Sequence, residues 1–287
     1  MVNRSQAVSF HNCLSHTRFT STGSPQGTVL SPVLFTLYTN DCKGTDISPV
    51  IKYSDDTAIQ DLSNSDTIFT QQVEKFIFWC KENYLDLNVK KTKEMIIDFR
   101  RKPDAIPDLY INGAKVERVD EYKYLGTILD NKLTFSANTQ AIYKKCQSRI
   151  YFLQKLRSLK VNAWILSNFY RCYIESVATF GFLCWLTGLK VKDKNKLERV
   201  VNVCSKVVGV RQKSLKELYE KRVVNKGRAI AGDSTHVLTL CFAMLPSGKR
   251  YRAMPCNSNR SRLSFTSKAI EYLNKNGFKG NSDFFKN

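Results

Sequence analysis

Apolar residues recur at three- and four-residue spacing in several parts of the chain, which predicts amphipathic helices. Residues 65–85 carry Ile68, Val73, Phe76, Ile77 and Cys80 in this rhythm, with Ser65 or Asp66 as a capping residue. From about residue 135 to 208 the same period continues through three longer segments. A further helix is expected just after the Gly/Pro-rich loop at residues 19–32, with Ser31 and Pro32 as its start signal.

Shorter stretches rich in β-branched and aromatic residues predict strands. Two of them flank the "SDD" tripeptide in "PVIKYSDDTAIQDL", one surrounds residues 95–99, and a Tyr-rich one follows the turn pair Asn112-Gly113. The expected fold class is therefore α+β, with a three- or four-stranded antiparallel sheet backed by two helices, followed by a helical region. We predict a mixed unit at residues 1–133, a helical unit at 134–210, and a basic carboxy-terminal region at 211–287 whose structure the pattern leaves open.

Positive charge is distributed unevenly along the chain. The formal net charge is +20, but residues 1–100 hold 10 Lys/Arg against 11 Asp/Glu, whereas residues 101–200 hold 18 against 9 and residues 201–287 hold 17 against 5. A polyanion is the expected partner for the basic two thirds. Nucleic acid fits best; an anionic membrane would also attract this charge, but no Trp-rich basic amphipathic helix points to one. No apolar stretch is long enough to span a membrane and the first ten residues lack a signal-peptide core, so an intracellular protein, nuclear or cytoplasmic, is expected.

Two adjacent acids, Asp55 and Asp56, occupy the tip of the hairpin that the two flanking strands predict. Carboxylates are hard oxygen ligands of Mg²⁺, and metal ions can clamp the attacking and leaving oxygens of a phosphoryl transfer. Acids in a turn are also common as plain solvated side chains, so both interpretations stay open on this pair alone. Cysteines are scattered without a C-x-x-C pair, and the three histidines do not cluster with them, which argues against a zinc site.

Four stretches occur in a fixed order: "GSPQGTVLSP", "YSDD", "LNVKKTK" and "YKYLG". Together they resemble the reverse transcriptases of non-LTR (LINE-like) retrotransposons, from about residue 19 to the end of the chain. The resemblance implies a partial polymerase palm followed by a helical thumb-like domain. A shorter segment, about residues 138–185, also resembles the domain named for the amino terminus of an AlkB-type repair protein, although no His-x-Asp…His iron set accompanies it.

The resemblance implies roles for individual residues. Asp55 and Asp56 match the catalytic, metal-binding acids, and Mg²⁺ or Mn²⁺ is the implied cofactor. Lys91, or the nearby Lys93, matches a cation that steadies or protonates the leaving pyrophosphate; ordinary surface lysines are the alternative. The implied nucleotide- and template-binding residues are Gly23, Ser24, Pro25, Gln26, Gly27 and Tyr53, and the implied primer grip is Tyr122, Tyr124, Leu125 and Gly126. Phosphate contacts are expected from Lys144, Lys145, Arg149, Lys155 and Arg157, whereas Trp164, Phe169 and Tyr170 are expected in the thumb core.

One implied component is missing from the residues at hand. The palm of this family needs a third carboxylate on a strand before the "SPQG" loop, yet residues 1–40 contain no Asp or Glu. The finger segments are absent too, so a truncated or decayed element is expected, inactive by itself. The competing hypotheses are an RNA-directed DNA polymerase fragment acting on an RNA template and DNA primer, a non-catalytic basic RNA/DNA-binding remnant or AlkB-homologue-like protein, and a fossil without function. The oligomeric state stays open.

Overall fold

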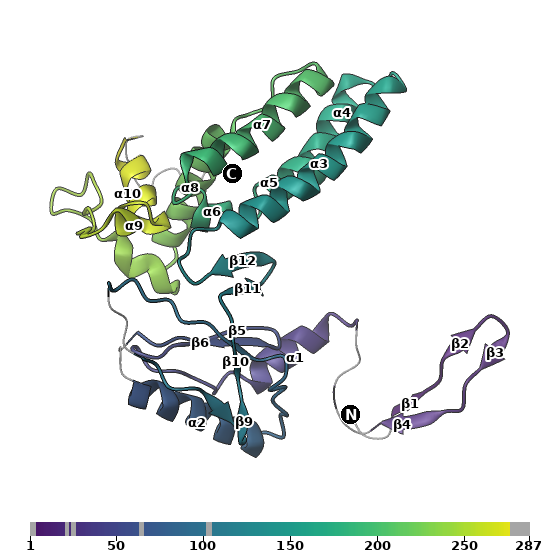
Figure 1. The fold of residues 1–287 in the computed structure, drawn as a ribbon, viewed down its shortest axis with the longest axis vertical. Helices are drawn as coiled ribbons and strands as arrows, with labels where there is room; N and C mark the ends of the chain where they lie inside the picture. Colours follow the sequence, from purple (N-terminus) through teal and green to yellow (C-terminus); the bar gives the residue numbers. More distant parts are fainter. Residues whose placement is uncertain (1–3, 21–22, 24–26, 63–65, 102–104, 276–287) are drawn as a thin grey trace. The chain divides into compact units, whose positions relative to one another are not determined.

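The structure is a computed structural model that describes residues 4–20, 23, 27–62, 66–101 and 105–275. The chain divides into two compact units. The first, here called the hairpin unit, comprises residues 1–94 and 102–118, and the second, the helical unit, comprises residues 95–101 and 119–287. The fold class is α+β, as the sequence predicted (Figure 1).

The hairpin unit consists mainly of short strands paired with their neighbours in sequence. β5–β6 and β8–β9 are antiparallel hairpins, β2–β3 lies within the longer β1–β4 hairpin, and β7 pairs with β10 in parallel. The elements are β1 (Arg4–Gln6), β2 (Ser9–Phe10), β3 (Cys13–Leu14), β4 (Arg18–Thr20), α1 (Leu30–Tyr38), β5 (Val50–Tyr53), β6 (Asp56–Ile59), α2 (Asp66–Glu82), β7 (Lys93–Glu94), β8 (Tyr110–Ile111), β9 (Ala114–Lys115) and β10 (Glu117–Arg118).

Two strand predictions were wrong. Every sheet within the described residues has only two strands, so the expected three- or four-stranded sheet does not form there. The apolar stretch at residues 95–99 is not a strand, and pairing stops at Glu94. Phe99 instead lies under the guanidinium of Arg260, 3.6 Å from its ring centroid, within the helical unit. Apolar β-branched residues favour a strand, but a strand also needs a partner edge, and no described strand pairs with these residues, of which Ile97 and Phe99 stay 42% and 55% exposed.

Helix α2 confirms the periodicity predicted for residues 65–85. Val73 and Cys80 are buried on its inner face, and Val73 joins Ile111 and Val116 in the small apolar cluster of this unit. Helix α1 begins at Leu30, close to the predicted start, but none of its side chains is fully buried. The hairpin unit therefore has a narrow core on one side of α2.

The helical unit begins with a hairpin and continues almost entirely as helix. Its elements are β11 (Glu121–Tyr124), β12 (Thr127–Asp130), α3 (Ser136–Ser158), α4 (Ala163–Phe169), the π-helix η1 (Tyr170–Glu175), α5 (Ser176–Ala178), α6 (Phe182–Trp185), α7 (Val191–Val208), α8 (Leu215–Ala231), the 3₁₀-helix η2 (Val237–Phe242), α9 (Asn259–Arg262) and α10 (Phe265–Lys275).

The long helical periods of the sequence predicted helices in this region, and α3 and α7 run side by side (Figure 1). At their amino-terminal ends, the Ser136 hydroxyl donates a hydrogen bond to Asp193 at 2.9 Å, and the Lys196 ammonium lies 5.0 Å from the Tyr143 ring centroid. Helices α8 and α10 also pack together, and a Cβ at Gly227 would lie 3.1 Å from the Cβ of Ala269. One continuous apolar cluster joins α3 to α10.

The predicted thumb core is correct in part. Tyr170 is fully buried in this cluster and Phe169 is half-buried against it, but Trp164 is 72% exposed. Trp164 is the second residue of α4, whose amino terminus is capped by the Asn162 side chain accepting from the Trp164 backbone N–H at 2.8 Å. Aromatic character predicted burial here, and the position of the residue in the first turn of the helix overrode it.

Candidate functional site

The acid pair lies at the tip of the β5–β6 hairpin. Tyr53 pairs with Asp56 across the two strands, so Ser54 and Asp55 form a two-residue turn. Ser54 adopts the left-handed conformation with φ of 55°, which tight hairpin turns require. Asp55 therefore occupies the turn itself, and Asp56 is the first residue of β6.

The two faces of this hairpin have different surroundings. Residues directly opposite each other on paired strands share a face. On one face, Val50 and Ile59 are half-buried, and Ile59 packs against the cluster around Val73. Lys52 shares that face and its ammonium donates to the Cys42 carbonyl at 2.9 Å and to the Thr39 carbonyl. The hairpin is thus attached to its unit through one face.

The opposite face carries the predicted chemistry and is open. It bears Tyr53 and Asp56, and further along Ile51 and Ala58. Tyr53 is 66% exposed, and Asp55 and Asp56 are exposed as well. Within the part of the chain that the structure describes, neither acid forms an ion pair and no three His, Cys, Asp or Glu side chains gather closely enough to hold a metal ion. Two solvated carboxylates are therefore available at the hairpin tip, Asp56 on this face and Asp55 in the turn.

The glycines of the predicted nucleotide loop have backbone conformations suited to tight loops. Gly23 and Gly27 have φ of 72° and 78°, the left-handed region that glycine adopts without strain. Ser24, Pro25 and Gln26 lie outside the described residues. After Gly27, the Thr28 hydroxyl accepts a hydrogen bond from the Ser31 backbone N–H at 3.3 Å, which leads the chain into α1.

The two candidate lysines differ in their surroundings. The Lys93 ammonium forms an ion pair with Glu117 at 2.5 Å and donates to the Lys90 carbonyl at 3.2 Å, across the β7–β10 pair. Lys91 is exposed in the preceding turn, where its backbone N–H donates to Asn88. Among the described residues its ammonium has no ion-pair partner. Lys91 is therefore the lysine of the two that is free to meet an anion.

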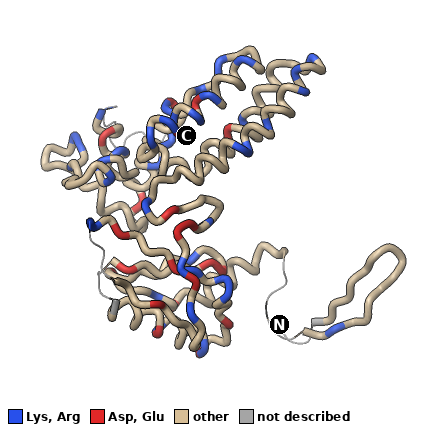
Figure 2. Tube along the Cα trace, viewed as in Figure 1, with Lys and Arg blue, Asp and Glu red and all other residues tan. Residues whose placement is uncertain are grey.

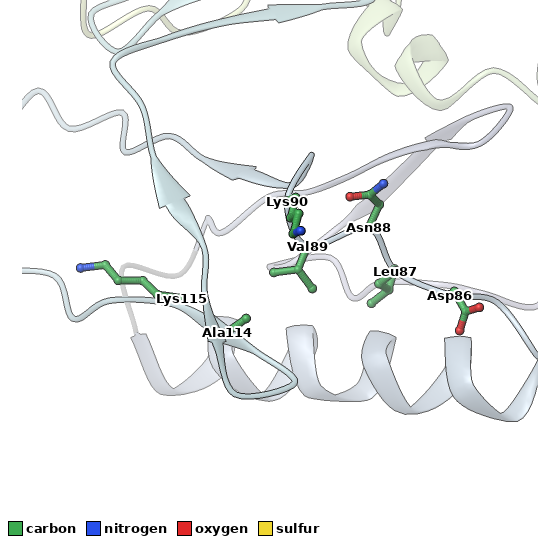
Figure 3. A pocket seen from close by; sticks show the side chains of 7 residues that line it. All are labelled: Asp86, Leu87, Asn88, Val89, Lys90, Ala114 and Lys115. Atoms are coloured by element: carbon green, nitrogen blue, oxygen red, sulfur yellow. The ribbon is translucent and has the colours of Figure 1, made fainter.

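A hollow of about 550 Å³ lies beside this turn (Figure 3). None of the predicted site residues lines it. The Lys115 side chain extends away from the other lining residues and forms an ion pair with Asp108 at 2.5 Å. The lining residues are Asp86, Leu87, Asn88, Val89, Lys90, Ala114 and Lys115. The hollow has no convergent polar groups and does not define a site.

The predicted primer-grip residues form the β11–β12 hairpin and its turn. Tyr124 pairs with Thr127, so Leu125 and Gly126 are the turn residues, both with positive φ, 45° and 86°. A Cβ at Gly126 would lie only 3.0 Å from the Phe180 ring. Tyr122 and Leu125 are partly exposed, which leaves them available for contact.

Asp130 holds this hairpin to helix α3, and sequence analysis missed it. Its carboxylate accepts from the backbone N–H groups of Thr134 at 3.0 Å and Phe135 at 2.7 Å, and from two further donors. Burial is the largest single influence on the pKa of Asp130 and raises it, but the hydrogen bonds together outweigh burial and hold the pKa below its ordinary value of 3.8. An acid between a strand and a helix start, followed by Thr134, is the only signal the sequence offers.

The five predicted phosphate contacts all lie on α3, but in different settings. A helix turns by about 100° per residue, which puts Lys144 and Lys155 opposite the buried stripe. Arg149 is different: its guanidinium lies 4.2 Å from the Tyr173 ring centroid and donates to the Tyr173 carbonyl. Lys144, Lys145, Lys155 and Arg157 are exposed.

Lys and Arg positions recur along the helices of the helical unit (Figure 2). Residues 131–174 contain eight Lys or Arg and no Asp or Glu, so α3, α4 and the start of η1 present charge of one sign. Among the helices that the structure describes, none is both long enough and apolar enough to cross a membrane.

Comparison with known protein families shows which families this chain resembles. The family "Reverse transcriptase (RNA-dependent DNA polymerase)" matches residues 2–129, which include the loop glycines, the acid pair and the primer-grip residues. These residues are therefore similar to the reverse transcriptase family. A second family, "Alkylated DNA repair protein alkB homolog 8, N-terminal", matches only residues 135–176. No solved structure matches the chain.

The similar curated proteins narrow the class to mobile elements. The chain is 27% identical over 219 residues to the probable RNA-directed DNA polymerase from transposon X-element of Drosophila melanogaster, covering 69% of this chain and 24% of that protein. It is 25% identical to the corresponding protein from transposon BS of the same species, over 64% and 21% of the two chains. It is 26% identical to the RNA-directed DNA polymerase from mobile element jockey of Drosophila funebris, over 60% and 20%.

These comparisons confirm the resemblance to LINE-like reverse transcriptases. The chain carries a retrotransposon reverse transcriptase domain, and it spans no more than 24% of the length of the curated relatives it matches.

Proposed function

We propose that this chain is the palm-hairpin and thumb-like part of a retrotransposon RNA-directed DNA polymerase, with Asp55 and Asp56 as its metal-binding acids. The observation that carries the proposal is the open face of the β5–β6 hairpin, which presents the acid pair beside Tyr53. The RNA template and DNA primer are its proposed partners, because template-directed nucleotidyl transfer requires both.

The donor set fits a magnesium or manganese ion in part. Two exposed carboxylates are the ligands that Mg²⁺ takes most often in proteins, where it keeps several waters and shares phosphate oxygens with the substrate. Asp55 and Asp56 would hold the ion, which when bound neutralises charge on the phosphates during displacement.

The remaining predicted residues have proposed roles around the nucleotide and the primer. Gly23 and Gly27 let the backbone approach the incoming nucleotide closely, and the side chains of residues 24–26 are proposed to contact base or sugar. Lys91 donates to the leaving pyrophosphate, which accumulates charge as it departs. Tyr122, Tyr124, Leu125 and Gly126 hold the primer strand, and the exposed lysines of α3 contact phosphates without reading bases.

We further propose that these 287 residues bind primer and template but do not extend the primer by themselves. The family's palm has three carboxylates, and residues 1–40 supply none. Losing one metal carboxylate costs several kcal/mol of transition-state stabilisation, and about 1.4 kcal/mol corresponds to a tenfold change in rate.

The test is primer extension on a poly-rA/oligo-dT substrate with Mg²⁺ or Mn²⁺, together with titration of Mn²⁺ into the free protein. Wild type, the Asp55→Ala/Asp56→Ala double variant and the control Asp46→Ala are compared, since Asp46 is also an exposed acid of the hairpin unit. We expect substrate binding by all three proteins, extension by none, and Mn²⁺ binding that is lost only in the double variant.

Two results would contradict parts of the proposal. Extension by wild type that disappears in the double variant would show that the site is completed in another way, for example by a second copy. Failure of wild type to bind the substrate, or Mn²⁺ binding unchanged in the double variant, would remove the polymerase assignment of these residues.

A further inference from the structure

An open groove of about 330 Å³ lies on the helical unit between α3 and the segment formed by α4 and η1. Its walls are mostly aromatic and aliphatic, with one cation. Phe152, on α3, is 51% exposed, and Tyr173, on η1, is also exposed. The lining residues are Phe152, Lys155, Leu156, Leu159, Phe169 and Tyr173.

The wall on the η1 side is held in place. The Arg149 guanidinium covers one side of Tyr173 at 4.2 Å and donates to its backbone carbonyl, and the Phe169 ring lies 5.2 Å away from the Tyr173 ring. The π-helical turn carries Tyr173, and such turns are rare and frequent at functional sites. Tyr173 is therefore preorganised, whereas Phe152 is 51% exposed and has the Tyr151 ring 5.6 Å away in an edge-to-face arrangement.

Charge indicates what the groove binds. It lies within residues 131–174, which carry eight Lys or Arg and no acid. Lys155 lines the groove itself, and Lys145 lies seven residues, about two helical turns, before Phe152 and so shares its face. An apolar peptide carries no negative charges that could pair with these cations. A ligand with flat apolar faces joined by regular negative charges matches both features.

We propose that this groove binds an unpaired base of single-stranded RNA or DNA. Phe152 stacks on the base, Lys155 and Lys145 contact the flanking phosphates, and Arg149 is a positioning residue that holds Tyr173. Base–aromatic stacking with a cationic track is the general mode by which proteins hold single strands without sequence preference. The site lies outside the acid pair and does not depend on polymerase activity.

The test uses the full chain and fluorescence anisotropy with labelled oligo(U) and oligo(dT) of about 15 nucleotides and a blunt duplex of equal length. Phe152→Ala is compared with Phe152→Tyr, which keeps the ring, and with Phe78→Ala, which removes another exposed phenylalanine, 65% exposed on α2. We expect Phe152→Ala to weaken single-strand binding about five- to 150-fold, with duplex binding changed less than twofold. Phe152→Tyr and Phe78→Ala should bind like wild type.

The salt dependence of oligonucleotide binding distinguishes the contribution of the Phe152 ring from that of the cations. Lys155→Ala should reduce the slope of log affinity against log salt by about 0.7, one phosphate contact on a single strand, whereas Phe152→Ala should leave the slope unchanged. Lys226→Ala, on the exposed side of α8, is the matched control and should leave both the slope and the affinity unchanged. Comparison of oligo(U) with oligo(dT) decides whether RNA or DNA is preferred.

Three outcomes would overturn the proposal. Equal losses for single strand and duplex would mean that the groove contacts backbone only. Equal effects of Phe152→Ala and Phe78→Ala would mean that ring removal acts nonspecifically, and an unchanged affinity in Phe152→Ala with a normal melting temperature would exclude stacking. Displacement of the oligonucleotide by an acidic amphipathic peptide that loses affinity in Phe152→Ala would assign the groove to a protein instead.

Discussion

The hairpin unit and the helical unit hold their functional side chains by different means. In the hairpin unit the fully buried apolar cluster contains only Val73, Ile111 and Val116, and α1 leaves its apolar side chains exposed. In the helical unit one cluster connects helices α3 to α10. The acid pair is therefore positioned mainly by local turn geometry and strand pairing, whereas the basic surface of α3 is positioned by core packing.

Because of this difference, the two units are expected to differ in their stability against denaturant. Hydrophobic burial is the dominant favourable term in folding, so the helical unit is expected to resist denaturant better than the hairpin unit. The acid pair, on the less buried unit, belongs to the part of the molecule that opens first. Four tests address this contrast, from the largest expected effect to the smallest.

Trp185→Ala should destabilise the helical unit most. Trp185 is 1% exposed and its indole N–H donates to the Phe180 carbonyl at 3.2 Å. Removal of a buried Trp side chain costs about 3–5 kcal/mol because it loses transfer energy and leaves a cavity. Urea unfolding followed by circular dichroism measures the loss; a change below about 1 kcal/mol would mean that the cluster does not determine the stability of this unit.

Asp130→Asn should cost about 1–3 kcal/mol, because the carboxylate accepts four hydrogen bonds and a neutral amide replaces them poorly. Since folding lowers the pKa of Asp130 from its ordinary 3.8, its contribution is fully present above that pH and is lost as the pH falls through the lower folded value. Wild type should therefore lose stability more steeply than Asp130→Asn as the pH falls below 3.8. Parallel acid-unfolding curves for the two proteins would refute this role.

Gly126→Ala and Gly113→Ala form a matched pair across the two units. Both glycines follow a positive-φ residue in a hairpin turn and have positive φ themselves, so each substitution should cost about 1–2 kcal/mol in strain. A Cβ at Gly126 also meets the Phe180 ring at 3.0 Å, whereas nothing lies within 4 Å of one at Gly113. Thermal melting should show the larger loss for Gly126→Ala. Adding Phe180→Leu to Gly126→Ala should remove this extra loss and bring it to that of Gly113→Ala. Equal losses, or no restoration, would show that Phe180 is not the cause.

Glu117→Gln should have the smallest effect, below about 1 kcal/mol. The Lys93–Glu117 pair is partly exposed, with side-chain accessibilities of 22% and 65%, and exposed ion pairs contribute little. The difference from wild type should shrink further in high salt. A loss above 2 kcal/mol by urea titration would indicate that this pair, rather than the small apolar cluster, holds β7 to β10.

Local patterns in the sequence predicted much of this structure. The spacing in residues 65–85 predicted α2, and Asn112-Gly113 predicted the β8–β9 turn, where both residues have positive φ. The acid pair was placed on a hairpin tip because flanking β-branched residues and a tight turn are local properties. Four ordered motifs indicated the reverse transcriptase family, and the family match over residues 2–129 confirms this resemblance.

Other features depend on contacts between distant residues, which periodicity does not encode. The lack of a strand at residues 95–99 and the pairing of Lys93 with Glu117 both follow from which partner lies nearby. The Phe152 groove also needs α3 and η1 to come together.

The sequence by itself thus determined the helical and hairpin segments, the reverse transcriptase family and the excess of positive charge. The tertiary structure decided which of the charged and aromatic side chains are open and which are engaged. Backbone propensity and turn chemistry act over a few residues and can be read along the chain, whereas burial and pairing depend on which residues, far apart in sequence, the fold brings into contact.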